Sequence, residues 1–86
     1  MKKDETKQKL SREIDALARK YTVTNSTNKL KLIQLRLEAS GKFLKATNEA
    51  FVKIMNEAQL PEADSNEIRK WAVDYIPKVN KKIVTG

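Results

Sequence analysis

Hydrophobic residues recur at helical spacing along most of the chain, and the longest regular stretch runs from Asn28 to Leu60 without a proline. Two seams of apolar or small residues follow this stretch. The first comprises Leu30, Ile33, Leu37, Gly41, Leu44, Phe51, Met55 and Ala58. The second comprises Leu32, Leu35, Ala39, Phe43, Ala46, Ala50 and Ile54, and at about 100° per residue it points almost opposite to the first. The pattern predicts one long helix, over about 28–59, that must be covered on two sides.

The weakest part of this predicted helix is the Ser40-Gly41 pair. Glycine costs about 1 kcal/mol in a helix interior, and Gly/Ser pairs are known kink sites. The first seam nevertheless keeps its phase from Leu37 through Gly41 to Leu44, which a loop would normally lose. We therefore favour one helix, bent at Gly41 or straight, over a break that would give four short helices. Close approach of another helix is the expected reason for the glycine.

A narrower seam predicts a shorter helix, over about 5–20, before the long one. Its members, spaced by four, three and four residues, are Leu10, Ile14, Leu17 and Tyr21. Asp4 or Thr6 is the predicted cap, and Asp15–Arg19 is a predicted i,i+4 ion pair. One apolar face means that this helix can cover one side of the long helix.

Two segments separate the predicted helices. The polar, threonine-rich run 21–28 predicts a loop whose last residues, 26–28, cap the long helix. Pro61 ends the long helix, because the residue before a proline avoids the helical region. The run 64–67, Asp-Ser-Asn-Glu, has the form of a capping box and predicts the start of a third helix.

The third predicted helix covers about 65–83 and carries a kink or a short restart at Pro77, which lacks a backbone donor. Its apolar stripe comprises Ile68, Trp71, Ala72, Tyr75, Ile76, Val79 and Ile83. At helical spacing, Trp71 and Tyr75 are expected in the core rather than on a base-stacking platform. The sequence thus predicts a single all-α domain, residues 1–86, with three helices arranged around one long central helix. Because the outer helices are shorter, we expect a homodimer to complete the cover.

Composition narrows the chemistry. The chain of 86 residues contains no cysteine and no histidine, which removes thiolate and imidazole metal ligands and the usual nucleophile and neutral-pH proton carrier. No glycine-rich phosphate loop is present either. We therefore expect no enzyme activity, no catalytic residue, no metal and no cofactor. No apolar run is long enough for a membrane span or a signal peptide, so the expected location is the cytoplasm.

Charge is the main functional signal. The net charge is +7, and it is unevenly spread: residues 19–45 carry +6, residues 46–67 carry −4 and residues 69–86 carry +4. Short connections make consecutive helices antiparallel, which would bring the two basic segments to one end of the fold. The residues expected at this basic pole are Arg19, Lys20, Lys29, Lys31, Arg36, Lys78, Lys81 and Lys82. Solvated lysines at helix ends are the plainer explanation.

The leading hypothesis is a small basic protein that contacts the phosphate backbone of a nucleic acid through this pole without reading sequence, with RNA slightly preferred over DNA. The alternative is a protein-binding inhibitor, immunity or adaptor module whose target is acidic or processes nucleic acid. Membrane binding is not expected, since the apolar seams should be committed to a core. In size, charge and helix content the chain is similar to bacteriocin immunity proteins and small phage accessory proteins, but it shares no motif with either.

Overall fold

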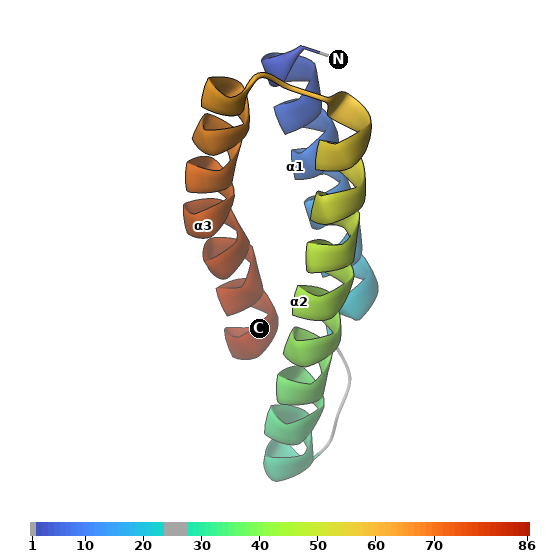
Figure 1. Ribbon diagram of the computed structural model, residues 1–86. Coiled ribbons are helices and arrows are strands. Elements are labelled where there is room, and N and C mark those ends of the chain that lie inside the picture. The colour runs from blue at the N-terminus through green and yellow to red at the C-terminus, as the bar shows by residue number, and fades with distance from the viewer. Residues whose placement is uncertain (1, 24–27) are drawn as a thin grey trace.

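The computed structural model describes residues 2–23 and 28–86, and these residues form three helices. They are α1 (Lys3–Tyr21), α2 (Lys29–Ala58) and α3 (Glu62–Thr85). Consecutive helices run antiparallel and all three pack side by side (Figure 1). The predicted all-α, three-helix fold is confirmed in the described part of the chain, although α1 and α3 also pack on each other, so α2 is the longest helix of a bundle and not its centre.

The long helix is continuous through Ser40 and Gly41, so the alternative of four short helices is wrong. Its N-terminus is capped by Asn28, whose side-chain oxygen accepts hydrogen bonds from the backbone N–H groups of Leu30 and Lys31 at 2.9 and 3.3 Å. These bonds satisfy two of the donors that a helix N-terminus leaves unpaired. The helix ends at Ala58, and the next residue, Gln59, has a left-handed backbone with φ of 49°. Of the predicted capping run 26–28, only Asn28 lies within the described residues.

The outer helices begin earlier than the sequence pattern predicts. α1 begins at Lys3, and Thr6 lies buried inside its first turns instead of capping it, with its hydroxyl donating to the carbonyl of Lys2 at 2.9 Å. α3 begins directly after Pro61, so Asp64 lies in its first turn and no side chain caps it. Acidic residues in a first turn stabilise the helix N-terminus through the helix dipole, so these helices are stabilised there without a side-chain cap. α3 continues through Pro77 as one helix.

The core forms where the three helices meet. Phe43 is fully buried near the middle of α2, in a cluster with Ile14 of α1 and with Ile83 of α3. A second cluster, nearer the α2–α3 connection, joins Leu10, Ile54 and Ile68. The predicted seams of α1 and α3 therefore supply the core residues that they were expected to supply. Trp71 is half-buried and packs against both clusters.

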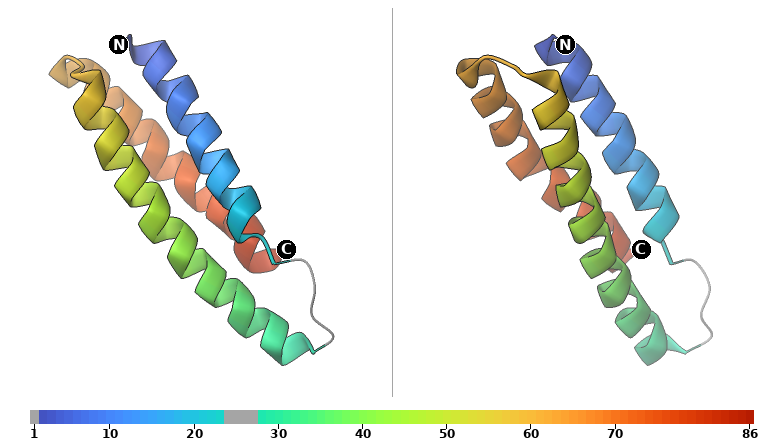
Figure 2. Two further views of the ribbon diagram at one scale, coloured as in Figure 1. Left: turned by 90° about the vertical axis from the view of Figure 1, so that its right-hand side faces the viewer. Right: turned by 45° about the vertical axis from the view of Figure 1, so that its right-hand side comes forward.

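α2 is covered on one side only, and its buried residues begin at Ala39. α2 has 30 residues, about 45 Å at 1.5 Å per residue, and so accounts for most of the 49 Å long axis of the molecule. Its N-terminal turns extend beyond the end of α3 (Figures 1 and 2). The second seam faces the core, whereas the first seam leaves four large side chains exposed. These four residues, the exposed stripe, are Leu30, Ile33, Leu37 and Leu44. The described chain therefore does not cover the exposed stripe, and its expected cover by a homodimer stays a prediction.

Two neighbouring polar residues of α2 behave differently in the core. The Ser40 hydroxyl donates to the Asn80 side chain at 2.6 Å and so ties α2 to α3. Thr47 is 1% exposed, and its hydroxyl oxygen has no hydrogen-bond partner among the described residues. Burying a hydroxyl removes its hydrogen bonds to water, which costs free energy. A hydrogen bond inside the protein offsets that cost, as for Ser40, whereas a hydroxyl without a partner destabilises the fold.

Replacing Thr47 with valine, which has nearly the same shape, should therefore raise the free energy of unfolding by about 1 kcal/mol. Ser40→Ala is the matched comparison and should lower it by about 1 kcal/mol, because Asn80 would be left without its partner. Urea denaturation followed by circular dichroism measures both. A Thr47→Val protein less stable than the parent would contradict the unpaired state of this hydroxyl.

Candidate nucleic-acid interface

The charges of the chain divide along the long axis of the bundle. Residues 15–23, 28–45 and 74–86, here called the basic half, contain ten Lys or Arg and three Asp or Glu. The rest of the described chain, the near-neutral half, contains eight of each. The antiparallel arrangement puts the end of α1, the start of α2 and the end of α3 in the basic half (Figure 2). The net charge of +7 thus lies entirely in that half.

Ion pairs are distributed in the opposite way. The pairs found among the described residues are Lys3–Glu67 at 2.6 Å and Lys9–Glu57 at 3.9 Å, and both lie in the near-neutral half. The hydrogen bond from Lys3 lowers the pKa of Glu67 and raises that of Lys3. No cation of the basic half has such a partner within the described residues. Ten basic residues against three acidic ones therefore leave this half with a net positive charge that no ion pair among the described residues reduces.

Three of the eight predicted site residues converge on one groove between α1 and α3. Arg19 comes from α1, and Lys78 and Lys82 come from successive turns of α3. The groove has a volume of about 450 Å³, and Ala18 and Val79 supply apolar lining. This α1/α3 groove combines three exposed cations with a surface that a chain of phosphates could follow.

One acid, Asp15, also lines the α1/α3 groove. Its carboxylate accepts a hydrogen bond from the Tyr75 hydroxyl at 2.6 Å, and Ser11 donates a longer bond of 3.4 Å to the Tyr75 oxygen. The bond to Asp15 raises the pKa of the Tyr75 phenol, because ionisation would remove the donated proton and place two negative charges together. Asp15 therefore connects α1 to α3 and offsets part of the positive charge in the groove.

The other predicted residues are spread around the basic half. Lys20 lies above the ring of Tyr21, 5.4 Å from its centroid. Lys81 is exposed but does not line the α1/α3 groove. Arg36 is half-buried with its guanidinium against Gly86, at the C-terminal end of α3, where a cation complements the helix dipole. Its Nε has no hydrogen-bond partner among the described residues.

Lys29 and Lys31 lie apart from the α3 lysines. The end of α3 reaches Arg36, so these two residues lie about 8–10 Å further along α2, at 1.5 Å per residue. The first turn of α2 contains no acidic residue, although a helix N-terminus carries partial positive charge. The residues predicted for the basic pole therefore do not form one compact cluster. They extend along one end of the bundle, with Lys29 and Lys31 at its tip.

Sequence reasoning missed the link between Asp15 and Tyr75. The i,i+4 spacing pointed to an ion pair of Asp15 with Arg19, but the structure places the carboxylate on Tyr75 of another helix. The one signal in the sequence is that Asp15 lies directly beside the apolar seam of α1, where a polar side chain can reach a neighbouring helix. Trp71 stacks on Tyr75 with ring centroids 4.8 Å apart, so neither ring forms an open platform for a base.

Other kinds of site find little support in the described residues. No group of three or more carboxylates there is arranged to hold a metal ion. None of the described helices combines the length and apolar character needed to cross a membrane.

The Tyr75 phenol should ionise above its ordinary value of 10.0, because Asp15 accepts its proton. The difference in ultraviolet absorbance between the parent and Tyr75→Phe, recorded against pH, isolates this ionisation from that of Tyr21. Asp15→Ala should bring the midpoint back toward 10.0. An unchanged midpoint in Asp15→Ala would mean that the hydrogen bond does not form in solution.

Comparisons with protein families, with curated proteins and with solved structures find no match to this chain. No relative therefore supplies a function or a set of site residues. What the protein does has to follow from its own charges, grooves and exposed apolar surface.

Proposed function

We propose that this is a small nucleic-acid-binding protein that contacts the phosphate backbone through its basic half, with RNA as the preferred ligand and DNA as the second. The observation that carries the proposal is the charge division: ten basic and three acidic residues in one half, eight of each in the other. Cations that neutralise phosphates release counterions, which drives binding without regard to sequence. A surface whose cations lack internal ion pairs is suited to that role.

The α1/α3 groove is the proposed centre of this interface. Arg19, Lys78 and Lys82 line it together, while Lys20 and Lys81 extend the positive surface around it. Lys29 and Lys31 add a second contact region at the N-terminal tip of α2, where the helix dipole attracts anions. Arg36 is the weakest member of the predicted set, because its guanidinium is already packed against Gly86.

Binding is proposed to follow backbone and shape rather than base sequence. Specific recognition of single strands relies on aromatic rings that stack on exposed bases. Here Trp71 and Tyr75 stack on each other and contribute to the core. A homodimer would carry two basic halves and would strengthen binding by linking two contacts to one nucleic acid.

A protein-binding module is the second candidate. The exposed stripe of α2 favours it, because a contiguous apolar surface on a small chain commonly marks a protein contact. An acidic or nucleic-acid-processing target would also account for the basic half. Recovery of one stoichiometric protein partner that persists after nuclease treatment would favour this candidate over the first.

Affinity for a single-stranded RNA, measured by fluorescence anisotropy on nuclease-treated protein, should fall linearly with salt on logarithmic axes. Combining Arg19→Gln, Lys78→Gln and Lys82→Gln should weaken binding strongly at low salt. It should also reduce the salt slope by roughly 2, because each phosphate that a cation neutralises on a single strand adds about 0.7 to that slope. Asp15→Ala should have the opposite effect on affinity, because it removes the one acid that lines the groove.

The matched control combines Arg12→Gln, Lys53→Gln and Lys70→Gln, three exposed residues of the near-neutral half. It removes the same net charge and should leave affinity nearly unchanged. Equal reductions of affinity in the two triple variants would contradict a localised interface. Undetectable RNA and DNA binding at low ionic strength, or tighter binding to anionic lipid vesicles than to RNA, would overturn the proposal.

A further inference from the structure

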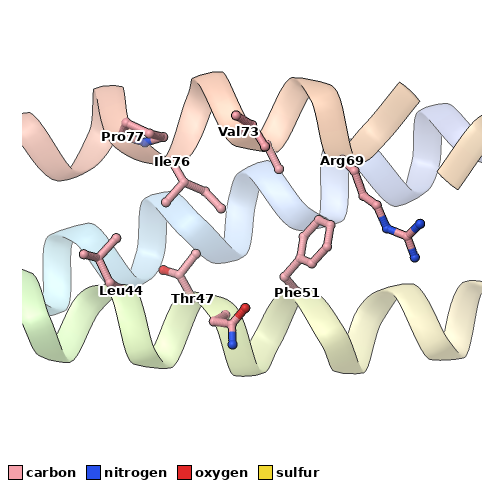
Figure 3. Close-up of a pocket in the computed structure, with 9 residues that line it drawn as sticks. Leu44, Thr47, Phe51, Arg69, Val73, Ile76 and Pro77 are labelled. Carbon is pink, nitrogen blue, oxygen red and sulfur yellow. The ribbon is translucent and has the colours of Figure 1, made fainter. Parts of the chain in front are cut away.

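The exposed stripe of α2 has no cover from residues 2–23 and 28–86, the part of the chain that the structure describes. Leu30 is 74% exposed and Leu37 is 57% exposed, far above what a helix packed on both sides would show. The stripe leads into a groove of about 550 Å³ between α2 and α3. In this α2/α3 groove, Phe51 points from α2 toward α3, and Val73 and Ile76 point back from α3 (Figure 3). Stripe and groove together form one apolar face along the molecule.

The spacing of this face is that of a helix-pairing seam. Large apolar residues recur every seven positions, at Leu30, Leu37, Leu44 and Phe51. A second set lies four positions after Leu37, Leu44 and Phe51 and consists of Gly41, Asn48 and Met55. Alternating steps of four and three keep such residues on one side of a helix that winds around another. The seam runs from residue 30 to residue 55, which is nearly the whole of α2. Its natural occupant is another long helix.

Gly41 lies near the middle of this seam, and the chain's own packing does not require it. Among the described residues, no atom of another helix lies within 4 Å of the position that a Cβ would take. A glycine in a helix interior lowers helix stability, so an exposed one without a neighbour has no structural reason within the monomer. Close approach of a helix from outside the chain supplies that reason.

We infer that a second copy of the chain occupies this face, with the two α2 helices antiparallel. In a symmetric pair centred between Gly41 and Leu44, each Leu44 packs over the partner's Gly41. Glu38 and Lys45, which are both exposed and immediately follow Leu37 and Leu44, flank the seam on the same side. Antiparallel pairing sets each Glu38 opposite the partner's Lys45, so the charges beside the seam are self-complementary.

Charge also selects the antiparallel direction. A parallel pair would bring two basic halves together at one end, and the net charge of each chain lies in that half. An antiparallel pair moves the basic halves to opposite ends, where mutual repulsion is smallest. It also carries Leu30 and Ile33 of each copy toward the partner's α2/α3 groove, which covers the part of α2 that extends beyond α3.

The area is sufficient for a stable dimer. Residues 30–55 span about 39 Å of helix. The face is roughly 20 Å wide where α3 lies beside α2, since packed helices are 8–10 Å apart. Pairing would bury on the order of 700 Å² per copy, close to the roughly 800 Å² per partner of a standard interface. The pairing depends on this apolar face and not on nucleic-acid binding.

Light scattering on nuclease-treated protein without nucleic acid, over micromolar concentrations, should give twice the chain mass of 9.9 kDa. Gly41→Gln and Leu44→Gln should each weaken dimerisation at least about ten-fold, as substitutions at the centre of an interface commonly do. Gly41→Gln has open space in the monomer, so the dilute protein should remain helical and at least as heat-stable as the parent. Ala16→Gln, on the exposed side of α1, is the control and should dimerise like the parent.

A charge exchange tests the direction of the helices. Glu38→Lys alone and Lys45→Glu alone should each weaken self-association, because like charges then face each other. An equimolar mixture of these two variants should form a mixed dimer, since opposite charges return at both positions. A chain that stays monomeric at all concentrations, or a dimer insensitive to Gly41→Gln and Leu44→Gln, would overturn the inference. So would a purified chain that stays monomeric while an unrelated helical protein binds the same face.

Discussion

α2 is longer than either helix that packs on it, and most features of the molecule depend on this mismatch. α2 has 30 residues, whereas α1 has 19 and α3 has 24. The two shorter helices can therefore cover one side of α2 but cannot surround it. Phe43, Ile54 and Ala58 take the enclosed side and form the core with the seams of the other two helices. What remains is an apolar face and an N-terminal tip that no part of the described chain covers.

The electrostatics of the basic half have two different origins. Arg19, Lys20 and Lys82 lie in the last turns of α1 and α3, where cations stabilise a helix by complementing its dipole. Lys29 and Lys31 lie at a helix N-terminus, where the same dipole disfavours them. The first group is accounted for by helix stability alone, whereas the second is not. The placement of Lys29 and Lys31 at the tip of α2 is therefore the part of the charge distribution that helix stability leaves unexplained.

Ser40 and Gly41 illustrate how adjacent residues of one helix acquire separate roles. In the sequence they form a single weak point, and a bend there is one interpretation. In the structure Ser40 faces inward and bonds to Asn80, while Gly41 faces outward over open space. The helix tolerates the pair because Ser40 gains a partner in α3. Gly41 has no contact with another helix among the described residues that would offset the helix stability it costs. The inferred dimer would supply such a contact.

The sequence by itself determined the helical class, the approximate extent of each helix, a cap for the long helix within residues 26–28 and the division of charge among segments. These follow from periodicity, capping preference and composition, which are properties of local stretches. Only the tertiary structure decided which seam of α2 is buried, that Arg19, Lys78 and Lys82 share a groove with Asp15, and that Arg36 is withdrawn against Gly86. A seam shows that a helix has an apolar side, but the path of the neighbouring helices decides which side they cover. For that reason Leu30 and Leu37 of the first seam are exposed, while Phe43 and Ile54 of the second seam are buried.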